Sequence, residues 1–352
     1  MVGEVTTSTD TARMLDTDTI LDVRDLRTHF TVEEGVIPAV DGVSFHVRKG
    51  ETLGIVGESG CGKSVTALSL LQLVQGPRGR VVGGEILYRK KSGDIVDIAA
   101  LRPDGQGIRG IRGPEIAMIF QEPMTSLNPL WTIGDQITES LIFHRILDPE
   151  AARKKAIDLL GMIGFSNPER RMNTYPHELS GGMRQRVMAA MALSCDPQIL
   201  IADEPTTALD VTVEAQILEL MRELQREFGM AIIIITHDMG VIAEMADRVV
   251  VMYTGKVAET SPVDDLFYSP LHPYTKGLLM SIPRVGISER LVPIRGSVPP
   301  MSELPVGCYF APRCPNAMDK CSTTPRLFEP SPEHFVNCWL YENSKEEDEF
   351  TE

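Results

Sequence analysis

The sequence lacks a hydrophobic run long enough to cross a membrane. Its longest apolar stretches, such as Ala231–Ile235 and Val249–Tyr253, fall far short of the ~20 residues that a transmembrane helix needs. The first residues, Met1–Thr19, are polar and acidic, and they have neither the basic flank nor the apolar core of a signal peptide. We therefore expect a cytosolic protein whose contact with a membrane is made through a partner.

Positive charge is also scarce. The 352 residues include 34 Lys and Arg against 49 Asp and Glu, which gives a net charge of −15 and argues against a protein that coats nucleic acid. Part of the acidic excess lies in Glu342–Glu352, which we expect to be a solvated, disordered tail. The apolar content of 43% and the charged content of 24% are ordinary for a soluble globular protein with an ample core.

The stretch Gly57–Ser64 carries the strongest functional signal. It has the form G-x-x-x-x-G-K-S, the phosphate-binding loop, and it stands between the strand-like run Thr52–Val56 and the helix-forming run Val65–Leu73. Backbone N–H groups of such a loop surround an anion, and the helix N-terminus adds the positive end of its dipole. A chance glycine-rich turn is the alternative, but the flanking strand and helix favour a nucleotide site. The predicted contacts are Gly57, Ser59, Gly60, Cys61, Gly62, Lys63 (to the β- and γ-phosphates), Ser64 (to Mg²⁺) and Val65.

Short strand-like segments precede this loop. They are Ile20–Val23, Thr28–Val32 and Val43–Val47, with turn residues between them, and they predict a sheet beside the nucleotide. Phe30 could stack on the adenine ring. A strand aromatic packed in the core is an equally good interpretation of Phe30.

Three further runs of buried-strand type end in polar side chains. Ligands of open α/β sheets bind at the carboxyl ends of parallel strands, so we expect these side chains to meet at one site. Paired acids could instead cap the turn after their strand, and a lone His is usually structural, but a phosphate loop in the same sheet favours catalysis. The runs and their polar residues are Ile116–Phe120 with Gln121, Ile199–Pro205 with Asp203 and Glu204, and Ala231–Thr236 with His237.

Each of these polar residues has a predicted role in phosphoryl transfer. Asp203 would hold Mg²⁺ through its water shell, and Glu204 would orient or deprotonate the attacking water. His237 would contact the γ-phosphate. Gln121 would touch both Mg²⁺ and the water, although this signal is weak when taken alone.

A second glycine pair opens a predicted helix. Leu179–Gly182 precedes a helix-forming run that extends through Cys195, and residues 122–178 before it form a predicted helical insertion. The simplest interpretation is an ordinary helix with Ser180 as its N-cap. Alternatively, N–H groups that no side chain covers form a second anion site. Since Gly57–Ser64 already serves one nucleotide, Ser180, Gly181 and Gly182 would then bind the nucleotide of another molecule, which predicts a dimer.

These motifs together resemble the ATP-binding subunit of ABC transporters. The resemblance implies an α/β phosphate-loop ATPase with a mixed-sheet core, a helical subdomain and a flanking antiparallel β-subdomain. It also implies that ATP is bound between two ATPase subunits, whose closure and reopening move membrane partners. Met183 departs from the commonest signature, which has Gln there, and leaves the Ser180 and glycine contacts intact. The family's order is matched over about residues 20–270 by Gly57–Ser64, Gln121, Leu179–Gly182, Ile199–Glu204, Asp210 and His237.

Shorter segments are similar to the peptide/nickel importers, and above all to the D-type subunit of dipeptide and oligopeptide permeases. These segments are Gln121–Pro129, Leu271–Leu279 and the cysteine-bearing C-terminus. The resemblance implies a heterodimer with a second homologous ATPase subunit, two integral-membrane permeases, an extracytoplasmic peptide-binding protein, no nucleic acid, and a peripheral location on the cytoplasmic face of the membrane. The alternatives are a nickel or other small-solute importer and a soluble ABC ATPase acting on DNA or ribosomes. The latter usually has long coiled-coil insertions or two ATPase domains, and neither feature is found in this sequence.

The expected organisation has four parts. Residues 1–17 form a disordered N-terminus, and residues 18–270 form the nucleotide-binding domain, with its helical subdomain at about 122–195. A cysteine-containing extension covers residues 271–340, and an acidic tail covers residues 341–352.

Four of the six cysteines fall in one proline-rich segment, with the spacing C-x5-C-x6-C-x16-C. The reducing cytosol disfavours disulfides, and zinc sites usually have closer cysteine pairs. Four thiolates on irregular loops suit a [4Fe–4S] cluster at least as well, with zinc and plain buried thiols as alternatives. ATP hydrolysis needs no electron transfer, so any such centre would be a structural staple or a redox sensor. The four are Cys308, Cys314, Cys321 and Cys338.

Overall fold

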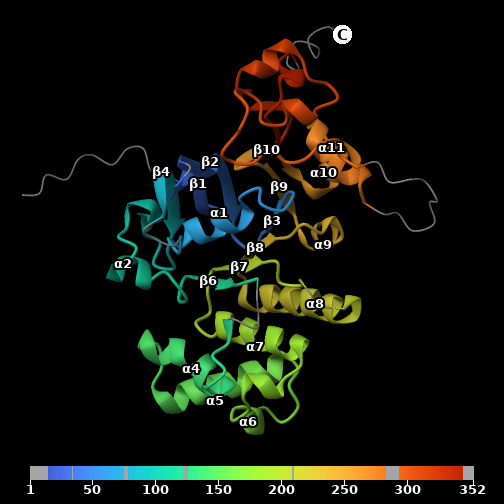
Figure 1. Ribbon diagram of the computed structural model, residues 1–352. Helices are drawn as coiled ribbons and strands as arrows, with labels where there is room; N and C mark the ends of the chain where they lie inside the picture. Colours follow the sequence, from blue (N-terminus) through green and yellow to red (C-terminus); the bar gives the residue numbers. More distant parts are fainter. Residues whose placement is uncertain are drawn as a thin grey trace, which may run out of the picture.

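The computed structural model describes residues 15–33, 35–74, 78–121, 126–207, 210–282 and 293–343. The predictions that concern residues 1–14, 122–125, 208–209 and 344–352 lie outside the described residues. Within the described ranges, no helix combines the length and the apolar character needed to cross a lipid bilayer. Figure 1 shows a sheet-rich body, a helical lobe on one side of it, and the C-terminal residues on the opposite side.

The body is built around an eight-stranded mixed sheet in the order β11-β12-β10-β9-β3-β8-β7-β6. Its parallel centre consists of β3 (Thr52–Val56), flanked by β9 (Arg248–Tyr253) and β8 (Ala231–Ile235), with β7 (Ile199–Asp203) and β6 (Ile116–Ile119) beyond β8. The apolar runs of β3, β7, β8 and β9 are buried along their whole length, as parallel strands covered on both faces must be. The predicted mixed-sheet core is therefore confirmed.

A second, antiparallel sheet has the order β2-β1-β4-β5. The sequence predicts separate strands at residues 20–23 and 28–32, but these form one strand with a register shift near Asp25, whose φ is 47°. Such a bulge breaks the alternation of side chains and makes one strand look like two in sequence. The bounds are β1 (Thr19–Val32), β2 (Gly35–Arg48), β4 (Gly79–Arg89) and β5 (Ile95–Asp97).

The predicted helical insertion forms the lobe that contains α4 to α7 (Figure 1). Helices α4 and α5 begin at side-chain caps: the Thr132 hydroxyl accepts the Asp135 N–H, and the Asp148 carboxylate accepts the Glu150 and Ala151 N–H groups. The lobe helices are α4 (Ile133–Phe143), α5 (Pro149–Met162), α6 (Pro168–Arg171) and α7 (Gly181–Leu193). The other α-helices in the described ranges are α1 (Lys63–Leu70), α2 (Gln106–Arg109), α8 (Val211–Phe228), α9 (Met239–Met245), α10 (Val263–Tyr268) and α11 (Pro273–Met280).

The C-terminal residues do not fold as a separate extension. The hairpin of β11 (Phe328–Ser331) and β12 (His334–Val336) continues the central sheet, because β12 pairs with β10 (Lys256–Pro262). After β10 the chain returns through β12, which pairs with the side of β10 that faces away from β9. A distinct cysteine-rich extension is therefore not supported.

The described parts of both chain ends pack on the body, although the sequence predicts that both are solvated. Leu15 is buried, and its carbonyl oxygen accepts a hydrogen bond of 3.1 Å from Arg89. Near the other end, the Tyr341 hydroxyl donates to the Leu271 carbonyl oxygen at 2.9 Å.

Candidate nucleotide site

The glycine loop joins β3 to α1, and two of its glycines are required by both conformation and space. Gly57 has φ 155°, and a Cβ there would lie 2.2 Å from the Met252 carbonyl oxygen. Gly62 has φ 100°, and a Cβ there would lie 2.3 Å from the Ala39 carbonyl oxygen. Both distances are impossible for real side chains, so neighbouring backbone fixes the path of the loop.

The predicted phosphate and magnesium ligands lie together at this loop. The Lys63 ammonium donates to the carbonyl oxygens of Gly57 at 2.8 Å and Glu58 at 3.2 Å, so the side chain folds back along the loop. The Ser64 hydroxyl donates to the Asp203 carboxylate at 3.0 Å. This pair unites the helix after the loop with the end of β7, as the predicted magnesium site requires.

The three predicted catalytic side chains also meet. The Gln121 amide nitrogen donates to one Glu204 oxygen at 2.9 Å, and His237 Nδ1 lies 3.2 Å from the other oxygen. The Thr207 hydroxyl donates to Glu204 at 2.9 Å as well. No sequence pattern points to Thr207, which lies three residues after Glu204 in the following turn.

The environments of the two neighbouring acids shift their pKa values in opposite directions. Burial raises the pKa of Asp203, against the lowering effect of the Ser64 hydroxyl. Burial also acts to raise the pKa of Glu204, but hydrogen bonds from Thr207 and His237 outweigh it, and the pKa is lowered. These hydrogen bonds thus favour the ionised form of Glu204, which is the form that can accept a proton.

The two glycines of the second pair lie in different surroundings, one packed and one open. Ser180 is the N-cap of α7, where its hydroxyl accepts the Met183 N–H at 3.4 Å. A Cβ at Gly182 would lie 2.7 Å from Val213, whereas a Cβ at Gly181 would meet nothing within 4 Å. Packing on α8 therefore explains Gly182, and Gly181 faces open space. Figure 1 shows α7 in the helical lobe and α1 in the sheet-rich body.

Two other predicted nucleotide contacts have structural roles here. Asp210 is the N-cap of α8, and its carboxylate accepts the N–H groups of Thr212 and Val213 at 3.1 and 3.0 Å. The Phe30 ring lies against Gly79, where an added Cβ would be 2.5 Å from the ring. For both residues, contact with the nucleotide stays a prediction.

Two residues with no predicted role hold the glycine loop, both through Glu58. The Glu58 N–H donates to the Tyr274 hydroxyl at 2.8 Å, and the Glu58 carboxylate is bound by both terminal nitrogens of Arg313 at 2.6 and 3.1 Å. Tyr274 lies in Leu271–Leu279, one of the segments that resemble the peptide/nickel importers. No signal in the sequence points to Arg313, which is 255 residues away from its partner.

The four C-terminal cysteines line one small enclosed cavity, together with apolar neighbours such as Phe310 and Trp339. Burial raises the pKa of the Cys308 and Cys314 thiols, and raises that of Cys338 to about 11. In the described parts of the chain, no group of three or more His, Cys, Asp or Glu side chains is arranged to hold a metal ion. This finding supports neither a zinc site nor a [4Fe–4S] cluster.

A glycine loop that faces a Ser–Asp pair and a Gln–Glu–His group at the ends of parallel strands defines a phosphate-loop ATPase. Comparison with family models extends this assignment. Residues 40–207 match the model described as "ABC transporter", and residues 258–321 match "Oligopeptide/dipeptide transporter, C-terminal region". The chain belongs to the ATP-binding proteins of the ABC transporter family.

Known relatives cover nearly the whole chain. The oligopeptide transport ATP-binding protein AppD of Bacillus subtilis is 55% identical over 92% of this chain and 97% of its own length. The dipeptide transport ATP-binding protein DppD of the same organism is 50% identical over 93% of this chain and 96% of its own length. Among solved structures, the dimeric ATP-binding cassette MJ0796, in a post-hydrolysis state bound to ADP and Pi, has a TM-score of 0.60 at 29% identity and covers 69% of this chain and 99% of its own.

Proposed function

We propose that this protein is the ATP-hydrolysing subunit of a membrane importer of dipeptides or oligopeptides. The observation that carries the proposal is that one chain contains both the nucleotide site and the C-terminal region described for oligopeptide/dipeptide transporters. The names of the relatives AppD and DppD support peptides over nickel or other small solutes as the cargo. They also favour a transporter over a soluble ATPase acting on DNA or ribosomes.

The side chains at the site suit hydrolysis of the γ-phosphate. Lys63 and the loop N–H groups hold the phosphates, and His237 contacts the γ-phosphate. Mg²⁺ held by Ser64 and Asp203 would neutralise the charge of the phosphates. Glu204, oriented by Gln121, takes the proton of the attacking water.

The second glycine pair would complete the nucleotide site of another subunit. Ser180, Gly181 and Gly182 stand at the exposed N-terminus of α7, and Gly181 leaves room for a ligand beside the backbone. The relative MJ0796 is dimeric when bound to ADP and Pi, which supports the same arrangement. We propose a heterodimer with a homologous ATPase subunit, and ATP binding closes this pair.

The helical lobe offers a surface for the membrane subunits. An open cleft of about 590 Å³ is lined by Leu130, Trp131, Ile142, Phe143 and Tyr175, together with the polar residues Thr132, Asp135, Thr138 and Glu139. Leu130 is 81% exposed and Phe143 is 66% exposed, and such apolar clusters mark protein interaction sites. We propose that two permeases bind here, one to each ATPase, that an extracytoplasmic peptide-binding protein delivers the cargo, and that the ATPase lies peripherally on the cytoplasmic face.

We also propose that the four cysteines hold a [4Fe–4S] cluster. Their gathering around one enclosed cavity supports this. In such a cluster each thiolate binds its own iron, so the four sulfurs stand farther apart than the ligands of a single ion. Anaerobically purified protein should then absorb near ~400 nm, and it should contain iron and sulfide, both lost in a Cys321→Ser variant. Colourless protein without iron would contradict this assignment.

Reconstitution of the whole transporter tests the proposed function. Vesicles that hold the complex should accumulate labelled peptide when ATP is supplied, and a Lys63→Ala variant should lose both ATP binding and uptake because the phosphates lose their cation. ATP-driven accumulation of nickel without peptide would contradict the peptide assignment. Co-purification with nucleic acid instead of membrane proteins would contradict the transporter assignment.

A further inference from the structure

The glycine loop is held from outside by residues near the C-terminal end of the chain. Arg313 forms a two-pronged ion pair with Glu58, the second residue of the loop, and its side chain is 5% exposed. Its third nitrogen donates to the Arg295 carbonyl oxygen at 3.0 Å, and one terminal nitrogen donates to the Tyr253 hydroxyl at 3.3 Å. The guanidinium is therefore fixed on all sides, and it fixes Glu58 in turn.

A second contact holds the backbone of the same residue. The Tyr274 hydroxyl accepts the Glu58 N–H at 2.8 Å, and Tyr274 is fully buried. Its ring packs against Tyr253 and Phe310, with ring centroids 4.7 and 5.4 Å apart. Side chain and backbone of Glu58 are thus attached to one rigid aromatic cluster.

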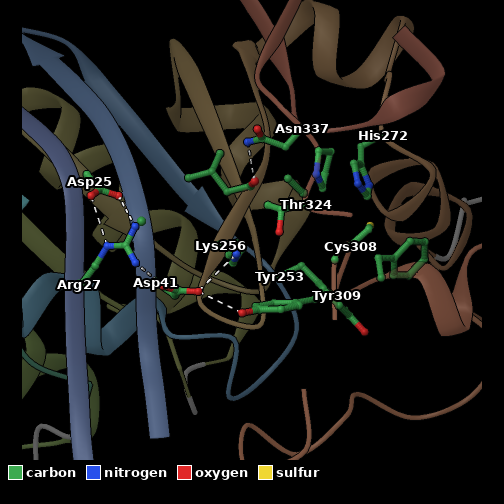
Figure 2. A pocket seen from close by; sticks show the side chains of 16 residues that line it. Asp25, Arg27, Asp41, Tyr253, Lys256, His272, Cys308, Tyr309, Thr324 and Asn337 are labelled. Atoms are coloured by element: carbon green, nitrogen blue, oxygen red, sulfur yellow. Dashed lines mark hydrogen bonds and ion pairs between the residues drawn. The ribbon is translucent and has the colours of Figure 1, made fainter. Parts of the chain in front are cut away.

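The loop that carries Arg313 is attached to the other end of the glycine loop as well. Tyr309 donates its hydroxyl to Asp41 at 3.0 Å, and Lys256 pairs with the same carboxylate at 3.3 Å, as Figure 2 shows. The Asp41 N–H donates to the Gly255 carbonyl oxygen, and the Gly255 N–H donates to the Cys61 carbonyl oxygen, each at 2.8 Å. The segment Cys308–Cys314 therefore acts on both residue 58 and residue 61.

We propose that Arg313 and Tyr274 are positioning residues for ATP binding, which hold Glu58 so that the N–H groups of the glycine loop point at the phosphates. The inference rests on the assignment of Gly57–Ser64 as the ATP site. It gives the C-terminal region a direct part in nucleotide affinity. A change in the conformation of the segment Cys308–Cys314 would thereby change the affinity for ATP.

The physical reason lies in the freedom of the loop. Glycines give the loop many conformations, and a loop that is already ordered loses less entropy when it binds a ligand. Arg313 and Tyr274 hold the loop in place before ATP reacts, so they affect the affinity for ATP more than the rate of the chemical step. Loss of their contacts with Glu58 should therefore raise KM and leave kcat nearly unchanged.

The direction in which Glu58→Gln changes the affinity for ATP distinguishes positioning by Arg313 from a simple effect of charge. Glu58→Gln removes a negative charge beside a triphosphate, and this change alone would tighten ATP binding. If Arg313 acts by positioning, the same variant binds ATP more weakly, because the two-pronged ion pair is lost. Unchanged or tighter binding by Glu58→Gln would overturn the proposal.

The full experiment measures ATP affinity and steady-state kinetics of the assembled transporter. Arg313→Ala and Glu58→Gln should each raise the Kd for ATP about tenfold, Arg313→Lys should recover part of the loss, and the Arg313→Ala, Glu58→Gln double variant should lose no more than either single one. Tyr274→Phe, which removes only the acceptor of the Glu58 N–H, should raise the Kd about threefold. Additive losses in the double variant, or a fall in kcat with KM unchanged, would contradict the proposal.

Two controls keep the outcomes distinct. Arg326→Ala removes an exposed arginine of the same C-terminal region and should leave the Kd unchanged. If Arg313→Ala fails to fold, Glu58→Gln and Tyr274→Phe still decide the question from the other partners. If the unmodified protein and Lys63→Ala bind ATP equally poorly, the assignment of the ATP site is wrong. If Arg313→Ala binds ATP normally, only the positioning role of Arg313 is contradicted.

Discussion

Two adjacent carboxylates at the end of β7 have different environments and therefore different uses. Asp203 is 4% exposed and bound to the Ser64 hydroxyl, whereas Glu204 receives hydrogen bonds from three side chains. The backbone of Glu204 adopts φ 47°, a conformation that residues other than Gly rarely take. This bend turns Glu204 away from the Asp203 face, toward Gln121 and His237.

Glu204→Gln is expected to separate binding from hydrolysis. The amide keeps the size of the side chain but cannot take a proton from water, so single-turnover hydrolysis of ATP should fall about 10²–10⁴-fold. The Kd for ATP should stay close to that of the unmodified protein, because Lys63 and the loop are intact. A variant that hydrolyses ATP at the normal rate would remove Glu204 from its proposed role.

At the scale of elements, Glu259 on β10 joins three parts of the chain. Its side chain is fully buried, accepts the N–H groups of Leu271 and His272 at 2.8 Å each, and lies 2.7 Å from His334 Nε2 on β12. Burial acts to raise the pKa of Glu259, but the hydrogen bonds from His334 and from the N–H groups of Leu271 and His272 lower it. This carboxylate links the C-terminal hairpin and the start of α11 to the central sheet.

Glu259→Gln should lower the free energy of unfolding by about 1–3 kcal/mol, because a buried donor loses its acceptor. The folded-state pKa of Glu259 is lowered, so its contribution is present above the ordinary carboxyl pKa of about 4.3 and is lost as the pH falls through the lower folded value. Chemical unfolding should show a constant difference between the two proteins near neutral pH and a shrinking one in acid.

The matched control for this prediction is Glu303→Gln, at an exposed position of the C-terminal region. It should leave the free energy of unfolding within about 0.5 kcal/mol of the original. Equal effects of Glu259→Gln and Glu303→Gln would contradict the linking role of Glu259.

At the scale of the whole molecule, the two glycine motifs lie in different surroundings. The loop at Gly57–Ser64 meets the acids of its own chain, while the motif at Ser180–Gly182 stands at the helical lobe with Gly181 open. In the proposed arrangement, one chain would offer its loop to one nucleotide and the N-terminus of α7 to another. Two such chains, placed face to face, would then complete both sites.

Gly181→Glu and Gly182→Ala should fail in different ways. A side chain at Gly181 meets no atom of its own chain, so Gly181→Glu should fold and bind ATP at its own loop with unchanged affinity. It should abolish ATP-dependent pairing with the second ATPase subunit, measured by light scattering, because a carboxylate then opposes the phosphates. Gly182→Ala should instead lower the melting temperature, since its Cβ would lie 2.7 Å from Val213. Normal ATP-driven pairing of Gly181→Glu would contradict the shared site.

The sequence alone was sufficient for the glycine loop, the order of the motifs and the buried strands β3, β7 and β8. These features have local signatures, because β-branched runs fill parallel strands and a phosphate loop needs fixed spacing. Their ends place Gln121, Asp203, Glu204 and His237 at one edge of the sheet, where the structure brings them together. The family could be identified from the order of the motifs along the chain, whereas no single motif was specific enough.

Only the tertiary structure decided what lies behind the loop and where the C-terminal residues belong. The pair Glu58–Arg313, the addition of β12 to β10 and the shared cavity of the four cysteines join residues far apart in sequence. Long-range contacts of this kind depend on how the chain returns to the sheet edge, and they leave no periodic pattern in the residues that make them. The loop can be found in the sequence, but the side chains that hold it in place cannot.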